Sequence, residues 1–257
     1  MEWHSPPTGN EAGRSVQFGT MELARIAAPS GRLKAALASP REEGPRPAII
    51  VIHEIFGLNR DMREKAQRLA DMGYVALAPD LYSTRGRMPF CVVRTVTGLK
   101  DGRGPVFDDL EACRQWLANR PEVDASRIGV MGFCLGGGIA LLYAVRSEVG
   151  VAAVFYGSVP KDAEDLDGVC PVVGGYGGRD KVFGKQGQRL QAHLHKQGLR
   201  NDIVTYPQAG HSYMSDHRGF FARLNSWGPT KVSFDPVAAE DSWRRVEAFF
   251  AEHLGER

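Results

Sequence analysis

A cysteine stands between glycines at a point where a strand is expected to end and a helix to begin. The sequence Gly-Phe-Cys-Leu-Gly occupies residues 132–136, directly after the apolar run 127–131. Small flanking residues allow a turn tight enough to present the Cys134 side chain at the sheet edge. A helix start favours the thiolate, and the Leu135 N–H could help to bind an oxyanion. We therefore interpret Cys134 as a nucleophile, with a buried structural cysteine as the alternative.

A thiol nucleophile needs a base that takes its proton and a carboxylate that orients the base. His211 is the candidate base, because it follows the strand expected at 201–206 through a short Pro-Gln-Ala-Gly loop. Asp180 is the candidate carboxylate, since it ends a glycine-rich turn behind another expected strand. Asp80 also follows a strand, but it precedes Cys134 and is expected to brace its own loop. The order nucleophile, acid, histidine is that of the α/β-hydrolase plan.

The other histidines are less well placed for this role. His193 and His195 fall in an expected helix, His4 and His253 lie near the two ends, and His217 has no strand leading to it. A further histidine at position 53 ends an apolar run and is expected to be a half-buried core residue with satisfied hydrogen bonds.

A glutamate follows the strand expected at residues 47–53. Glu54 would lie close to Cys134, and few structural roles explain it, because a buried charge is costly unless it is paired. An oxyanion hole usually needs two N–H donors, and the Ile55 N–H is the natural partner of the Leu135 N–H.

These side chains require a sheet whose strand ends meet at one edge. Alternating strands and helices predict an α/β protein with a mostly parallel, doubly wound sheet of about eight strands flanked by helices. We expect a flexible leader at 1–15 and one domain over 16–257. Strands are expected at 16–26, 32–38, 47–53, 74–78, 127–131, 151–156, 172–176 and 201–206, and helices at 60–72, 107–119, 137–146, 183–197 and 236–254.

Composition excludes several classes of partner. The formal net charge is only +2 and charges of both signs are interleaved, so neither nucleic acid nor a membrane surface is an expected partner. No run is long and apolar enough for a membrane helix, and the N-terminus lacks a signal-peptide pattern, so a cytoplasmic location is expected. The four cysteines are widely spaced, which favours neither a zinc site nor a disulfide framework. We expect no metal or organic cofactor.

The sequence resembles the dienelactone hydrolase (carboxymethylenebutenolidase) family of the α/β-hydrolase superfamily. The resemblance rests on residues 53–59, 78–82, 132–137, 177–180 and 210–213. It implies attack of Cys134 on a lactone carbonyl, a thioester intermediate and hydrolysis by water. It also implies that substrate binding moves the Glu54 side chain, which then removes the thiol proton. Asp180 and His211 complete the triad.

Substrate recognition is less defined by the sequence. Family members bind a substrate carboxylate through arginines, and Arg85, Arg94 and Arg218 are the candidates here. The predicted function is hydrolysis of a small lactone or ester by a monomer or small homo-oligomer. Three alternatives stay open: a general carboxylesterase or thioesterase for neutral substrates, a non-catalytic binding relative, and a redox sensor that uses Cys134.

Overall fold

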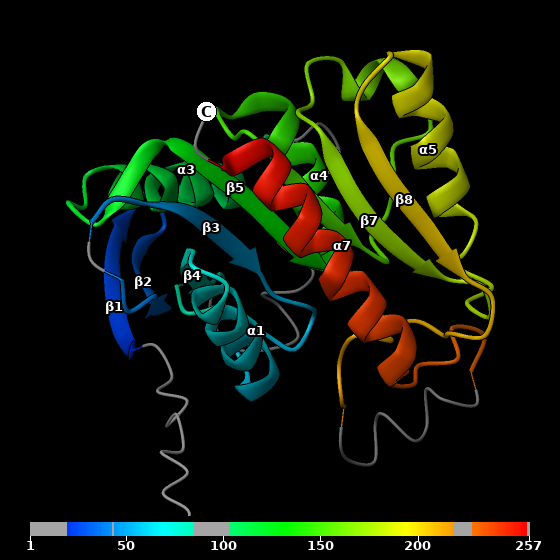
Figure 1. Ribbon diagram of the computed structural model, residues 1–257, viewed down its shortest axis with the longest axis horizontal. Helices are drawn as coiled ribbons and strands as arrows, with labels where there is room; N and C mark the ends of the chain where they lie inside the picture. Colours follow the sequence, from blue (N-terminus) through cyan, green and yellow to red (C-terminus); the bar gives the residue numbers. More distant parts are fainter. Residues whose placement is uncertain (1–19, 43, 85–102, 218–227, 256–257) are drawn as a thin grey trace, which may run out of the picture.

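One eight-stranded sheet forms the centre of the fold (Figure 1). The computed structural model describes residues 20–42, 44–84, 103–217 and 228–255. The sheet order is β1-β2-β4-β3-β5-β6-β7-β8. The strands are β1 (Thr20–Ala28), β2 (Gly31–Ser39), β3 (Arg46–Ile52), β4 (Val75–Asp80), β5 (Val123–Phe133), β6 (Ala152–Phe155), β7 (Val172–Gly177) and β8 (Asn201–Tyr206).

The sheet is parallel except at one edge. β2 pairs antiparallel with both β1 and β4, whereas β4, β3, β5, β6, β7 and β8 pair in parallel. The β1–β2 turn is tied down by Asp109, which accepts hydrogen bonds from the Ser30 N–H at 3.1 Å and the Ser30 hydroxyl at 2.7 Å. The carboxyl ends of six parallel strands therefore lie at one edge, where ligands of such sheets bind.

Helices cover both faces of the sheet. They are α1 (Arg60–Asp71), α3 (Pro105–Ala118), α4 (Leu135–Arg146), α5 (Gln186–Lys196) and α7 (Pro236–Leu254), with a short 3-10 turn, η1 (Ala163–Leu166). Strand side chains alternate between the faces. Ile49 and Val51 of β3 join the core beneath α1 and α7, which stand in front of the sheet in Figure 1. Ile50 and Ile52 join the opposite core, beneath α3, α4 and α5.

The structure confirms the predicted fold class and each expected strand and helix with shifted ends, and residues 16–19 of the first expected strand lie outside the described residues. α4 begins at Leu135 rather than at residue 137, directly behind the cysteine. α5 begins at Gln186 rather than at residue 183, because the Phe183 N–H donates to Asp180 Oδ1 instead of entering a helix. The expected leader at 1–15 lies outside the described residues.

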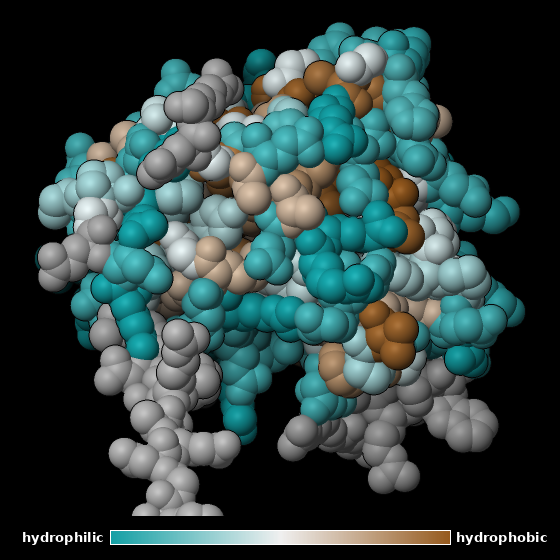
Figure 2. Space-filling model, viewed as in Figure 1, coloured by the Kyte–Doolittle hydropathy of each residue, from teal (hydrophilic) through white to brown (hydrophobic). Residues whose placement is uncertain are grey.

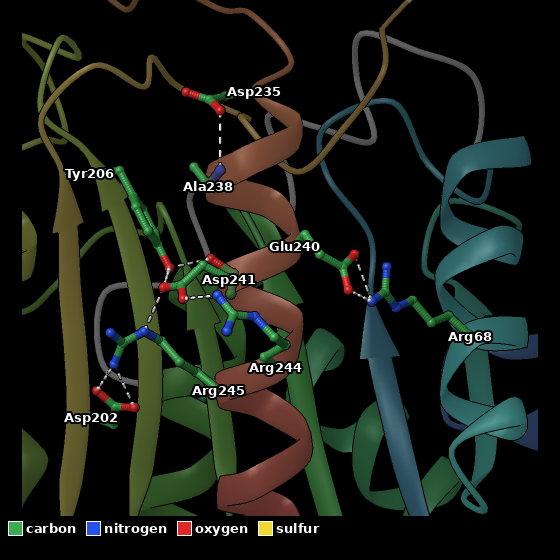
Figure 3. Close-up of polar contacts among 10 residues, drawn as sticks. Arg68, Asp202, Tyr206, Asp235, Ala238, Glu240, Asp241, Arg244 and Arg245 are labelled. Atoms are coloured by element: carbon green, nitrogen blue, oxygen red, sulfur yellow. Dashed lines mark hydrogen bonds and ion pairs between the residues drawn. The ribbon is translucent and has the colours of Figure 1, made fainter.

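Polar contacts anchor α7 to its neighbours (Figure 3). The Asp235 carboxylate caps the helix by accepting from the Val237 and Ala238 N–H groups, each at 3.1 Å. Further along α7, Asp241 accepts from the Tyr206 hydroxyl of β8 at 2.8 Å. The remaining pairs join Arg245 to Asp202 and Asp241, Arg244 to Asp241, and Arg68 of α1 to Glu240.

Hydrophilic side chains dominate the face seen in Figure 2, which lies over α1 and α7, and apolar patches on it are separate. Among the described helices, none is sufficiently long and apolar to cross a membrane.

Candidate active site

Cys134 occupies a sharp turn between β5 and α4. Its backbone has φ 54° and ψ −116°, a conformation that costs energy for a residue with a side chain. The turn depends on glycine: a Cβ at Gly132 would lie 2.0 Å from the Gly136 carbonyl oxygen, and one at Gly136 would lie 2.3 Å from that of Ile52. The Cys134 side chain is half-buried. The tight, strained turn that the sequence predicts between a strand and a helix is present, and the nucleophilic role of Cys134 stays a prediction.

The three residues expected to form a triad lie in one hydrogen-bonded chain. His211 Nε2 is 3.1 Å from Cys134 Sγ, and His211 Nδ1 is 2.7 Å from Asp180 Oδ2. The other Asp180 oxygen, Oδ1, accepts from the Val182 N–H at 2.9 Å and the Phe183 N–H at 3.0 Å. Asp180 is therefore fixed by its own loop while it orients the imidazole.

The environment favours a charged imidazole at His211. Burial alone would lower its pKa, but hydrogen bonds to Asp180 and Cys134 and their charges raise the pKa to about 10. The His211 imidazole therefore holds a proton beside the Cys134 sulfur.

Backbone contacts from the segment before α7 position the His211 loop. The His211 N–H donates to the Thr230 carbonyl at 2.9 Å, and the Asp235 N–H donates to the Tyr213 carbonyl at 3.0 Å. Gly210 allows the approach, since a Cβ there would lie 1.6 Å from the Lys231 carbonyl oxygen.

Glu54 is buried at 1% exposure and holds three close partners. Its Oε1 accepts from the Tyr156 hydroxyl at 3.1 Å and the Ser215 hydroxyl at 2.9 Å. Its Oε2 lies 2.6 Å from His217 Nε2, a close ion pair without hydrogen-bond alignment. Burial alone would raise the pKa of Glu54, but His217, Lys65 and Ser215 outweigh it and the pKa is lowered.

Tyr156, Ser215, His217 and Lys65 did not stand out in the sequence. Tyr156 directly follows β6 and has a positive φ of 42°. In the sequence it is visible only as a large residue at the end of an expected strand. Lys65 occupies a buried position of α1 and donates to Asp61 at 2.6 Å and Ser215 at 3.1 Å. No strand leads to His217, so the sequence does not indicate a role for it, yet it contacts Glu54 from the loop that carries His211.

The two expected oxyanion donors follow two neighbouring strands, β3 and β5. Ile55 follows β3, Leu135 follows Cys134, and β3 and β5 are paired up to Ile52 and Gly132. Within the described part of the chain, neither N–H donates a hydrogen bond to the protein. Their role as oxyanion donors stays a prediction.

Residues expected to have structural roles have them. His53 is buried, its Nδ1 donates to the Glu54 carbonyl at 2.7 Å, and its Nε2 accepts from the Leu81 N–H at 3.1 Å. It is a satisfied core histidine, more deeply buried than expected. Asp80 accepts from the Tyr82 N–H at 3.1 Å and so braces its own turn. The candidate substrate-binding residues Arg85, Arg94 and Arg218 lie outside the described residues.

The sheet order, the turn at Cys134 and the loops that carry Asp180 and His211 define an α/β-hydrolase. Solved structures support this class. A Klebsiella pneumoniae protein assigned as a dienelactone hydrolase has a TM-score of 0.74 and 29% identity, and the match covers 91% of this chain and 99% of that one. A dienelactone hydrolase-like promiscuous phosphotriesterase, P91, from metagenomic libraries has a TM-score of 0.76 and 25% identity, covering 92% of this chain and 100% of that one.

Sequence comparisons define the family within this class. The model of the dienelactone hydrolase family matches residues 33–254. A Methylorubrum extorquens protein assigned as a carboxymethylenebutenolidase is 32% identical, and the match covers 89% of this chain and 80% of that protein. The chain belongs to the dienelactone hydrolase family, and it is an enzyme of the carboxylic-ester hydrolase class.

Proposed function

We propose that this enzyme hydrolyses a small lactone or carboxylic ester through a thioester on Cys134. One observation carries the proposal: Cys134 Sγ, the two His211 nitrogens and Asp180 Oδ2 form a continuous chain at the elbow. The names of the relatives favour a lactone such as dienelactone as substrate. We expect the enzyme to act in the cytoplasm, without a cofactor, as a monomer or small homo-oligomer.

The reaction would proceed in two displacements. The Cys134 thiolate adds to the carbonyl carbon while the Ile55 and Leu135 N–H groups receive the developing oxyanion. When the intermediate collapses, the carbon–oxygen bond breaks, and the His211 imidazolium gives its proton to the departing oxygen. Water then adds to the thioester, His211 takes a proton from that water, and Cys134 leaves as the thiolate. The net change is addition of one water across the ester bond.

Glu54 lies outside the two displacements, but the family resemblance gives it a part. The family resemblance implies a glutamate that removes the thiol proton, whereas here the Glu54 carboxylate binds Tyr156, Ser215 and His217. In this conformation His211 is the group in contact with sulfur. Proton removal by Glu54 would require its carboxylate to leave these three partners when substrate enters.

A general carboxylesterase or thioesterase for neutral substrates is the second candidate. Exposed apolar side chains next to the candidate site favour it: Ile55 and Phe56 follow Glu54, and Val182 follows Asp180, with exposures of 37%, 49% and 50%. Such side chains suit an uncharged acyl or alcohol group better than a carboxylate.

The first test measures the loss of ultraviolet absorbance of a dienelactone solution on adding the wild-type enzyme, with Cys134→Ala as its matched control. Turnover by wild type alone supports the nucleophile and acceptance of an acidic lactone. A matched series of neutral phenyl and alkyl esters follows under the same conditions. Turnover of neutral esters alone selects the general esterase, and equal rates for both proteins on every substrate would overturn the nucleophile assignment.

A further inference from the structure

His53, directly after β3, is a buried titratable residue that the two displacements do not use. Its side chain bridges two backbone groups: Nδ1 donates to the Glu54 carbonyl at 2.7 Å, and Nε2 accepts from the Leu81 N–H at 3.1 Å. A backbone N–H can only donate, so Nε2 is the unprotonated nitrogen and Nδ1 carries the proton. Burial lowers the pKa of His53, which favours the same neutral state. His53 is therefore held in one neutral tautomer.

The carbonyl that His53 binds is fixed by two hydrogen bonds. The Glu54 carbonyl also accepts from the Gly57 N–H at 3.1 Å, which closes the turn formed by residues 54–57. This carbonyl and the Ile55 N–H belong to the same planar peptide unit, and in a trans peptide they point in opposite directions. The bonds that fix the Glu54 carbonyl therefore also fix the direction of the Ile55 N–H.

The end of β3, which leads into this peptide unit, lies against the turn at Cys134. A Cβ at Gly136 would lie 2.3 Å from the Ile52 carbonyl oxygen and 2.6 Å from the His53 carbonyl oxygen. The Ile55 N–H, the expected oxyanion donor, comes two residues after His53. Such a donor stabilises the transition state only when it points to the place where the charge develops. An error in its direction therefore slows acyl transfer more than it weakens substrate binding.

We propose that His53 is a positioning residue that, through the Glu54 carbonyl, orients the Ile55 N–H toward the oxyanion formed when Cys134 adds to a carbonyl. A neutral histidine suits this position because its rigid ring has a donor on one side and an acceptor on the other. It satisfies both backbone groups without adding a charge beside the site. This role rests on the proposed function, since without acyl transfer no oxyanion forms.

Two substitutions at His53 separate its two hydrogen bonds. In His53→Asn, the side-chain amide reaches the place of Nδ1 and can still donate to the Glu54 carbonyl. In His53→Gln, the longer side chain reaches the place of Nε2 and can still accept from the Leu81 N–H, but the bond to Glu54 is lost. Each variant loses one buried hydrogen bond, so the two should show similar falls in Tm.

The test measures steady-state kinetics on the lactone or ester that wild type hydrolyses in the assay described above. We expect His53→Gln to lower kcat about tenfold with KM within about twofold of wild type, because a misdirected donor loses part of the stabilisation that it gives only to the transition state. His53→Asn keeps the bond to the Glu54 carbonyl, so its kcat should stay within about threefold of wild type.

Alkylation of Cys134 by iodoacetamide is the control for structural damage, measured by mass spectrometry of the peptide that contains this cysteine. Alkylation displaces iodide from a saturated carbon and forms no oxyanion, so both variants should react within about twofold of the wild-type rate. Damage to the turn at Cys134 would instead slow alkylation and hydrolysis together.

Equal kcat values for the asparagine and glutamine variants would overturn the proposal, as would parallel losses of alkylation and hydrolysis in His53→Gln. If His53→Gln does not fold, His53→Asn alone decides: kcat within about threefold of wild type supports the proposal, and a larger fall overturns it. If wild type hydrolyses no lactone or ester, the proposed function fails and this role fails with it. If wild type is active and the two variants are equal, the role of His53 fails alone.

Discussion

A cysteine nucleophile at position 134 would need a different base from a serine nucleophile at the same place. The strained backbone with φ 54° accommodates either side chain, so the elbow itself does not select between them. The difference lies in the proton, since a thiol is deprotonated far more easily than a hydroxyl. The pKa of His211 is raised to about 10, so its imidazole can hold a proton beside Cys134 and donate it to a departing group.

Replacing Cys134 with serine tests this match of thiol and base. We expect Cys134→Ser to lower kcat/KM at least about 100-fold at pH 7, because His211 and Glu54 are arranged for a group that ionises readily. Steady-state kinetics on the best substrate measure the change, with Cys134→Ala as the background. Activity of the serine variant equal to that of wild type would contradict a thiolate mechanism.

Replacing Asp180 with asparagine separates its two carboxylate oxygens. Oδ1 accepts two backbone N–H groups and Oδ2 contacts His211, so the amide can keep the loop bonds but presents an N–H₂ group to the imidazole. We expect Asp180→Asn to lower kcat by about 10³- to 10⁴-fold, as in other triads whose acid is made neutral. A small change in Tm would show that the fold is kept, and kcat within about tenfold of wild type would remove Asp180 from the triad.

Elements were predictable where hydrophobic periodicity is strong. Continuous apolar runs identified β3, β5, β6 and β7, because a strand covered on both faces is apolar throughout. The ends were less predictable, since they depend on side-chain contacts that the pattern does not contain. The first turn expected for α5 instead forms the loop that binds Asp180 Oδ1.

Site residues that follow strands were predictable, while their buried partners were not. Cys134, Asp180 and His211 each come directly after a strand or its loop, and parallel strands end at the same edge. Tyr156, Ser215 and His217 are recognised only by their contact with Glu54. Ser215 and His217 contact Glu54 because of the path of the His211 loop, which the local sequence does not specify.

The cap of α7 provides a test at the level of a single helix. Asp235→Ala removes the acceptor for the Val237 and Ala238 N–H groups and should lower the free energy of unfolding by about 1 kcal/mol. Asp235→Asn, which can still cap, is the matched control. Urea unfolding measures both variants. Equal losses in both would show that the cap bond is not the cause, and kcat/KM should be unchanged.

Across the whole molecule, α7 joins distant parts of the chain. It pairs with α1 through Glu240 and Arg68, and with β8 through Asp241 and Tyr206 (Figure 3). The aromatic residues Trp243, Phe249 and Phe250 fill the core on the same face of the sheet. This helix therefore connects both halves of the sheet.

The stability of the molecule in acid should depend on the ion pair between Asp241 and Arg245 of α7. A hydrogen bond to Arg245 lowers the pKa of Asp241 despite partial burial, whereas an unfolded aspartate titrates near pH 3.9. Because the folded pKa is the lower one, this contribution is complete above about pH 4 and is lost as the pH falls through the folded value. The Tm of wild type should therefore fall more steeply below about pH 4 than that of Asp241→Asn. Parallel Tm profiles for the two proteins would contradict the linkage.

The contacts of the His211 loop also affect the order of events during synthesis. Backbone contacts with Thr230 and Asp235 fix this loop, and α7 covers the core beneath it. These residues lie near the C-terminal end of this sequence, so they are synthesised well after the turn at Cys134. A ribosome releases the chain from its N-terminus, and these residues leave the exit tunnel late. A nascent chain can therefore already contain Cys134, Asp180 and His211 before the hydrogen-bonded chain between them has formed.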